Sequence, residues 1–107
     1  MPIVRIDFDE KVASKSDVEL LSMAVQKIVV QETNIEDVVV YANDSQIKVK
    51  AWPIEIFVQM SDHKVKNEDQ LFEALKSRLK SWKMENSFQH PINLTFIPMH
   101  WKIEIGI

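Results

Sequence analysis

The spacing of hydrophobic positions changes along the chain, and these changes predict its secondary structure. Residues 3–8 alternate between apolar and polar side chains, with the period of two that is typical of a half-buried strand. Residues 18–28 carry apolar side chains at helical spacing and predict a helix that reaches to about Thr33. Because Ser16 and Glu19 have the form of a capping box, we expect this helix to begin at Ser16.

The same order of elements returns in the second half of the chain. A β-branched run at residues 38–41 predicts a short buried strand, and residues 53–60 predict a second clear strand. Asn67 is a helix start, and the apolar face that follows it continues to Trp82. Residues 93–97 then predict another strand.

Two stretches have weaker patterns. Residues 46–50 alternate in a way that is compatible with a short edge strand. Residues 101–105 alternate similarly and predict a short last strand.

The order β-α-β therefore occurs twice, in residues 2–41 and in residues 53–97. Laying Pro2 on Pro53 also lays Ser16 on Asn67, so strand start and helix cap coincide, which predicts an internal repeat. In this alignment the apolar parity of the first strand is not kept, because Val4, Ile6 and Phe8 fall on Glu55, Phe57 and Gln59. A bulge, or a sheet buried on both faces, would account for the conflict.

Two such units side by side predict an α+β fold, with a four-stranded mixed sheet and both helices on one face. We expect one domain over residues 1–107. The other face of the sheet is then uncovered. Because apolar residues occur at both strand parities, we expect this face to pack against further copies of the chain in a symmetric oligomer.

Composition excludes several classes of function. The net charge of −3 gives no general attraction for phosphate backbones or anionic lipids, so we expect neither nucleic acid nor a membrane as a partner. There is no cysteine, and Gly106 is the only glycine, which excludes thiolate chemistry and glycine-rich phosphate loops. With neither a signal-peptide pattern nor a long apolar run, we expect the protein in the cytoplasm.

Pro2, directly after Met1, is the candidate with the most distinctive chemistry. If Met1 is removed, Pro2 carries a free secondary amine, and burial or nearby cations lower the pKa of such an amine. An amine with a pKa near neutral can abstract a proton next to a carbonyl group. Because proline is a common residue, a proline without catalytic function is the alternative.

The basic residues are open to two interpretations. Arg5 shares the first strand with Pro2, so it is a candidate to lower the amine pKa or to bind a carboxylate, but strand arginines often form only surface ion pairs. We interpret Lys48 and Lys50 as edge-strand lysines that oppose aggregation. A further stripe of lysines, which we interpret as a complement to a helix dipole, consists of Lys76, Lys80 and Lys83.

The histidines and tryptophans give no clear site. His63, His90 and His100 stand apart at no metal-ligand spacing, so we predict no metal site. Trp82 lies on an apolar helix stripe and is expected in the core, while Trp101 is a candidate for a contact between subunits.

The Met-Pro-Ile start on a strand, the tandem β-α-β units and a length near one hundred residues together resemble the tautomerase superfamily. This superfamily includes 4-oxalocrotonate tautomerase and macrophage migration inhibitory factor. The Pro-Ile-Glu-Ile strand at Pro53 and the Phe-Ile-Pro that ends at Pro98 are similar to an uncharacterised bacterial branch. Members are typically trimers with the terminal proline in a pocket at the subunit boundary.

The resemblance implies that Pro2 is the base that moves a proton between carbon and oxygen of a 2-oxo acid or its enol, without a cofactor. An arginine that precedes the first helix cap in the family falls on Lys15, which keeps the charge but loses the bidentate fork. A second family arginine falls on Val39. Lys15 or Arg5 would then hold the substrate carboxylate. The alternative is a non-catalytic oligomeric or ligand-binding protein that retains the scaffold.

Overall fold

The elements follow the predicted β-α-β order, repeated once. The computed structural model describes residues 1–107. Its elements are β1 (Ile3–Phe8), α1 (Lys15–Thr33), β2 (Val39–Asn43), β3 (Ile54–Ser61), the 3-10 turn η1 (Asp62–Lys64), α2 (Glu68–Glu85) and β4 (Asn93–Met99).

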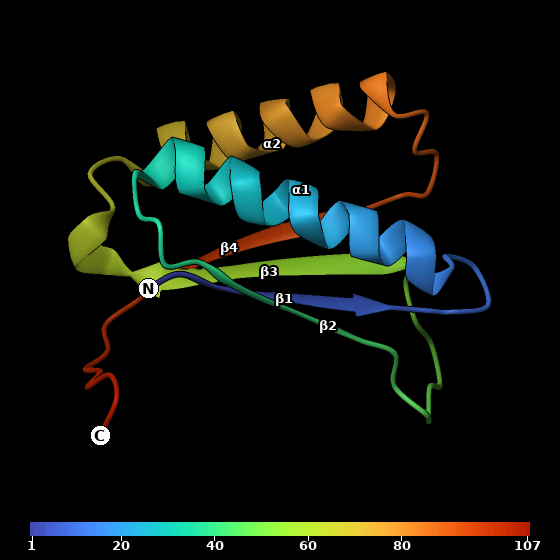
Figure 1. The fold of residues 1–107 in the computed structure, drawn as a ribbon, viewed down its shortest axis with the longest axis horizontal. Coiled ribbons are helices and arrows are strands. Elements are labelled where there is room, and N and C mark those ends of the chain that lie inside the picture. The colour runs from blue at the N-terminus through green and yellow to red at the C-terminus, as the bar shows by residue number, and fades with distance from the viewer.

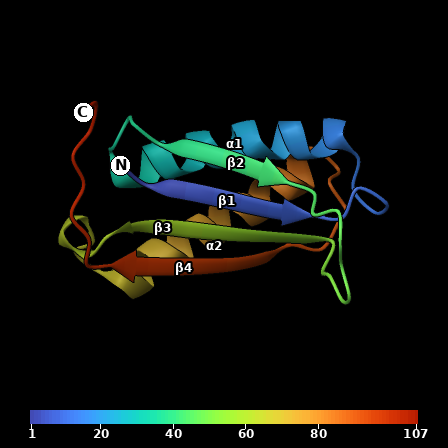
Figure 2. The same cartoon turned by 90° about the horizontal axis from the view of Figure 1, so that it is seen from below.

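The strands form one mixed sheet in the order β2-β1-β3-β4. β1 pairs with β2 and β3 pairs with β4 in parallel, while the two units join through the antiparallel pair β1 and β3. Both helices lie on the same face of the sheet (Figure 1), and the opposite face is open when seen from below (Figure 2). The predicted α+β fold is therefore confirmed.

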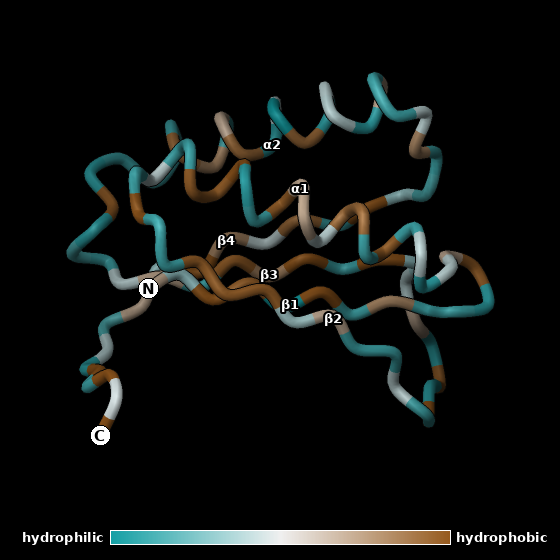
Figure 3. Tube along the Cα trace, in the orientation of Figure 1, coloured by the Kyte–Doolittle hydropathy of each residue, from teal (hydrophilic) through white to brown (hydrophobic).

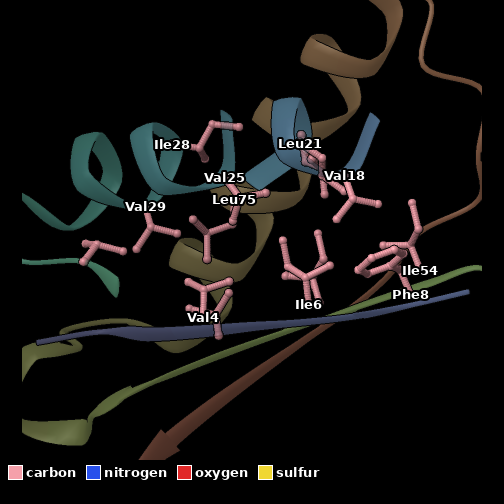
Figure 4. Packing of buried hydrophobic residues seen from close by; sticks show 14 of the residues in the cluster. Val4, Ile6, Phe8, Val18, Leu21, Val25, Ile28, Val29, Ile54 and Leu75 are labelled. Carbon is pink, nitrogen blue, oxygen red and sulfur yellow. The ribbon is translucent and has the colours of Figure 1, made fainter. Parts of the chain in front are cut away.

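The core fills the space between the helices and the sheet. Apolar segments of α1 and α2 turn toward the sheet (Figure 3), and their side chains meet those of the strands (Figure 4). The pairs Val4↔Val58 and Ile6↔Ile56 project onto the helix side of the sheet and are almost completely buried. The helices complete the core with Val18, Leu21, Val25, Ile28, Val29, Leu75 and Leu79.

The alignment of the two halves needs correction in the strands. β1 and β3 pair continuously from Phe8↔Ile54 to Ile3↔Gln59, so no bulge separates them. The buried positions of both strands alternate as predicted, with Ile54 in β3 as fully buried as Val4 in β1. The alignment that places Pro2 on Pro53 is therefore shifted by one residue in the strands. This shift explains why it matched buried positions of β1 with outward-facing positions of β3.

The N-cap of the first helix lies two residues before the predicted cap at Ser16. Its N-cap is Ser14, whose hydroxyl accepts a hydrogen bond of 3.1 Å from the backbone N–H of Asp17. The turn after β1 buries Ala13 completely, and this places Ser14, the next residue, at the cap position of the helix. The capping box at Ser16 was thus a wrong prediction. The other predicted helix boundaries are confirmed: α1 ends at Thr33, and Asn67 caps α2.

Three strand predictions also need correction. β2 is an edge strand with exposed residues from Tyr41 onward, and only Val38 and Val40 on its core side pack inward. Residues 46–50 and 101–105 form no strand. In residues 46–50 the apolar side chains of Ile47 and Val49 face solvent. The alternation of apolar and polar residues in this segment therefore does not mark a buried face.

No helix of the chain has both the length and the apolar character needed to cross a membrane.

Candidate functional site

Pro2 lies directly before β1, at the edge of the sheet where β3 and β4 end (Figure 1). Its side chain is less than 2% exposed. Its carbonyl oxygen accepts a hydrogen bond of 3.1 Å from the backbone N–H of Val39 at the start of β2. Because proline has no backbone N–H to donate, the start of a strand is one of the few places in a sheet where it fits.

The chemistry of Pro2 depends on Met1. While Met1 is attached, the nitrogen of Pro2 is an amide and cannot act as a base. Once Met1 is removed, the same nitrogen is a secondary amine that belongs to the buried ring. Burial disfavours the charged form of an amine and so lowers its pKa.

Arg5 lies on the opposite face of the sheet from the ring of Pro2. The two residues have opposite parity in the strand, and Val4 of the Pro2 parity faces the helices. The guanidinium carbon of Arg5 stands 4.5 Å from the ring centre of Phe57, and its Nε is 3.2 Å from a carboxylate oxygen of Asp7. Arg5 is therefore already engaged on the open face, with 48% of its side chain exposed.

Lys15 stands at the other end of β1. β1 itself spans about 20 Å, at about 3.3 Å per residue over its six residues, and Lys15 lies beyond the turn that follows this strand. Its ammonium group is 3.8 Å from Glu10, and its side chain is 74% exposed. Lys15 also lines a hollow of about 580 Å³ beside β2. Within one chain, Pro2 and Lys15 cannot touch the same small molecule.

The position of the second family arginine lies next to Pro2. Val39 occupies it and contributes its backbone N–H to the proline, but its side chain has no charge. In a single chain, therefore, none of the three predicted or family-implied carboxylate-binding positions places a cation beside Pro2.

The sequence interpretation missed a cluster of polar side chains at the same edge of the sheet. Asp62 and His63 follow β3, and His100 follows β4. The rings of His63 and His100 stand edge to face with centres 5.8 Å apart. The available signal was that each histidine lies three residues beyond the end of a predicted strand, at Met60 and at Ile97, because parallel strands end at the same edge.

The third histidine lies elsewhere. His90 Nε2 is 3.2 Å from a carboxylate oxygen of Asp17. This contact joins the loop before β4 to the first turn of α1, within an open groove of about 600 Å³ between the helices. Trp82 borders this groove and is packed against the core, as expected from the sequence.

Comparison with known proteins identifies the fold. No family model matches the chain, and no curated protein matches it in sequence. Solved structures do match it over nearly its whole length. Malonate semialdehyde decarboxylase has a TM-score of 0.70 at 9% identity, and the match covers 98% of this chain and 92% of that chain. That enzyme was solved as wild type, in an inactivated form and with alanine replacing the proline at its first position.

Two further matches have similar quality. The asymmetric trimer of a fused 4-oxalocrotonate tautomerase has a TM-score of 0.66 at 13% identity, covering 94% of this chain and 91% of that one. A macrophage migration inhibitory factor-like protein from Entamoeba histolytica has a TM-score of 0.65 at 15% identity, covering 96% and 95%. All three are tautomerase-superfamily structures, so the predicted resemblance is confirmed for the fold.

Proposed function

We propose that this chain is a homo-oligomeric isomerase that moves a proton within a 2-oxo acid or its enol, with Pro2 as the base after removal of Met1. The observation that carries the proposal is the position of Pro2. It is the buried residue before the first strand of a fold shared with enzymes of the tautomerase superfamily. An amine in such a position has the lowered pKa that a general base needs near neutral pH.

The substrate carboxylate requires a cation, and we assign this role to Lys15 in preference to Arg5. The guanidinium of Arg5 is bound to Asp7 and to the ring of Phe57, so binding a substrate would require breaking both contacts. Lys15 has only one distant partner and is largely exposed. As a point charge, it would hold a carboxylate with less geometric constraint than an arginine would.

The distance from Lys15 to Pro2 makes an oligomer part of this proposal. A neighbouring subunit would have to bring its own Lys15 to the Pro2 edge. The open face of the sheet offers the surface for such an assembly, since it carries Phe57, Tyr41 and Ile97 between polar residues. A trimer, as in the fused 4-oxalocrotonate tautomerase, is the proposed arrangement.

A second candidate function has an observation of its own. Val39 leaves the immediate surroundings of Pro2 without the family arginine, and Arg5 points to the other face. A protein with this fold but without isomerase activity would have these features. This alternative is a non-catalytic oligomer or ligand-binding protein.

An assay of enol-to-keto conversion separates the two functions. We would follow the ultraviolet absorbance of an enolised aryl 2-oxo acid with untagged wild-type protein, Pro2→Ala and Pro53→Ala. Pro53 is the matched control, because it also precedes a strand and its carbonyl accepts a backbone hydrogen bond of 3.0 Å from Asp9. The proposal requires activity that Pro2→Ala loses and Pro53→Ala keeps. Equal rates in all three proteins would favour the non-catalytic alternative.

A further inference from the structure

Three metal-ligand side chains meet at the carboxyl ends of β3 and β4. Asp62 and His63 belong to η1, which follows β3 directly, and His100 is the first residue after β4. Because β3 and β4 are parallel and in register from Glu55↔Asn93 to Ser61↔Met99, their ends lie side by side. Residues far apart in the sequence therefore become neighbours at this edge.

The geometry of these side chains suits a common ligand. One donor atom from each of Asp62, His63 and His100 lies within 4.8 Å of the other two. The carboxylate of Asp62 is 3.9 Å from Nε2 of His63. Zinc holds such donors at about 2.0–2.2 Å, which puts tetrahedral donors about 3.4 Å apart. A contraction of at most about 1.4 Å completes the site, and because all three side chains are exposed, rotation of the side chains suffices.

The backbone of this cluster is fixed more firmly than its side chains. The hydroxyl of Ser61 accepts a hydrogen bond from the backbone N–H of His63, and the N–H of Val65 donates to the carbonyl of Asp62 at 3.2 Å. Two of the three donors thus project from one ordered turn. No lysine or arginine pairs with Asp62, whose ion-pair partner is His63. The carboxylate is consequently available to a metal ion.

We propose that Asp62, His63 and His100 bind a divalent transition-metal ion of the zinc, cobalt or nickel class. Two imidazoles with one carboxylate favour these ions over magnesium and calcium, which prefer oxygen ligands. Three protein ligands leave at least one coordination position open to water or to another ligand. This set was missed in the sequence because no two of these residues have the spacing of a helical metal motif.

The site lies at the same edge of the sheet as Pro2. Ile3 pairs with Gln59, so continuing the register places Met1 level with Ser61, directly before Asp62. The segment that contains His100 also leaves the sheet at the edge where the amino terminus lies (Figures 1 and 2). The proposal rests on the donor set alone and does not require the proposed isomerase activity.

Titration of untagged full-length protein with Co²⁺ and Zn²⁺ tests the site. We would record the visible absorption of bound Co²⁺ and measure Zn²⁺ affinity by calorimetry for wild type, His63→Gln, His100→Gln and His90→Gln. His90 is the matched control, because it is bonded to Asp17 away from the cluster. Circular dichroism checks that each variant is folded.

The site predicts saturable binding of one ion per chain with a Co²⁺ spectrum of low coordination number. It also predicts that His63→Gln and His100→Gln each weaken metal binding at least about tenfold. Removing even a residue that only hydrogen-bonds to a metal ligand typically lowers metal affinity by about this factor. His90→Gln should bind like wild type. Binding that does not saturate, an equal loss in all three variants, or a loss in only one of the two cluster variants would overturn the proposal.

Discussion

The backbone N–H of Val39 donates a hydrogen bond of 3.1 Å to the carbonyl oxygen of Pro2. This bond joins the residue before β1 to the start of β2, so the proposed base is positioned by main-chain contacts of the sheet. The contact uses neither the nitrogen nor the ring of the proline. Substitution at Pro2 therefore leaves this hydrogen bond in place, which makes Pro2→Ala a usable test of chemistry.

Substrate binding should depend on Lys15 more than on Arg5. We predict that Lys15→Gln raises KM for a 2-oxo acid at least about tenfold with a small effect on kcat, because a hydrogen bond to a charged group contributes about 1.5–3 kcal/mol. Arg5→Gln should change KM by less than Lys15→Gln, since Arg5 is engaged by Asp7 and Phe57. Steady-state kinetics decide between them. A larger KM effect in Arg5→Gln would reverse the assignment.

Oligomer formation should depend on the open face of the sheet. We predict that Phe57→Glu converts the assembly to monomers, because it replaces an apolar ring with a charged side chain on the surface proposed to be buried between subunits. Leu20→Glu is the control, since Leu20 is 60% exposed on α1, away from that face. Sedimentation velocity measures both variants. Dissociation by Leu20→Glu, with Phe57→Glu still assembled, would place the interface on the helices.

The start of α1 can be tested with two neighbouring serines. Ser14→Ala should lower the free energy of unfolding by about 1 kcal/mol, because it removes the cap bond to the N–H of Asp17. Ser16 lies inside the helix, so Ser16→Ala should change the free energy of unfolding by less than about 0.5 kcal/mol. Urea unfolding followed by circular dichroism gives both values. The reverse order of effects would restore the capping box that the sequence suggested.

The Asp44–Lys48 ion pair should make stability depend on pH in the acid range. The side-chain hydrogen bond from Lys48, helped by the backbone N–H of Glu10, lowers the pKa of Asp44 below its ordinary value of 3.8. A carboxyl group with a lowered pKa stabilises the fold above its unfolded pKa, and this contribution is lost as pH falls through the folded pKa. The same bond raises the pKa of Lys48, so the contribution of that lysine is present at neutral pH and lost only at strongly basic pH.

Nuclear magnetic resonance titration of the Asp44 carboxyl carbon measures this effect directly. Lys48→Gln should raise the pKa of Asp44 toward the ordinary value, whereas Lys50→Gln should leave it unchanged, because no ion pair joins Lys50 to a carboxylate. An identical pKa of Asp44 in wild type and Lys48→Gln would show that the ion pair does not form in solution.

The sequence predicted the architecture well because periodicity reports burial directly. Val4 and Ile6 flank the polar Arg5, and both are fully buried, so the strand and its helix-covered face followed from the pattern. The pattern failed at Ile47 and Val49, where alternation has no packed partner. Local sequence alone could not show whether Ser14 or Ser16 caps the first helix. The turn after β1, which buries the residue before Ser14, determines that Ser14 is the cap.

The candidate site was predictable only in part. Pro2 was recognisable from its position in the chain, since the chemistry of a terminal proline depends on no three-dimensional contact. That Lys15 lies a strand length away and that Arg5 faces Phe57 depend on the sheet register, which the sequence did not define. The meeting of His63 and His100 depends on the parallel pairing of β3 and β4. Such contacts between distant residues leave no local pattern to detect.

Chemical labelling can show whether Pro2 is a free amine that is activated as a base. Untagged protein would be exposed to an alkylating 2-oxo acid across a pH series, with intact mass and peptide mapping of the product. We expect a chain without Met1, an adduct on Pro2 and half-maximal labelling near neutral pH. Retention of Met1, or a free Pro2 that stays unlabelled until strongly basic pH, would contradict it and leave the non-catalytic scaffold as the remaining function.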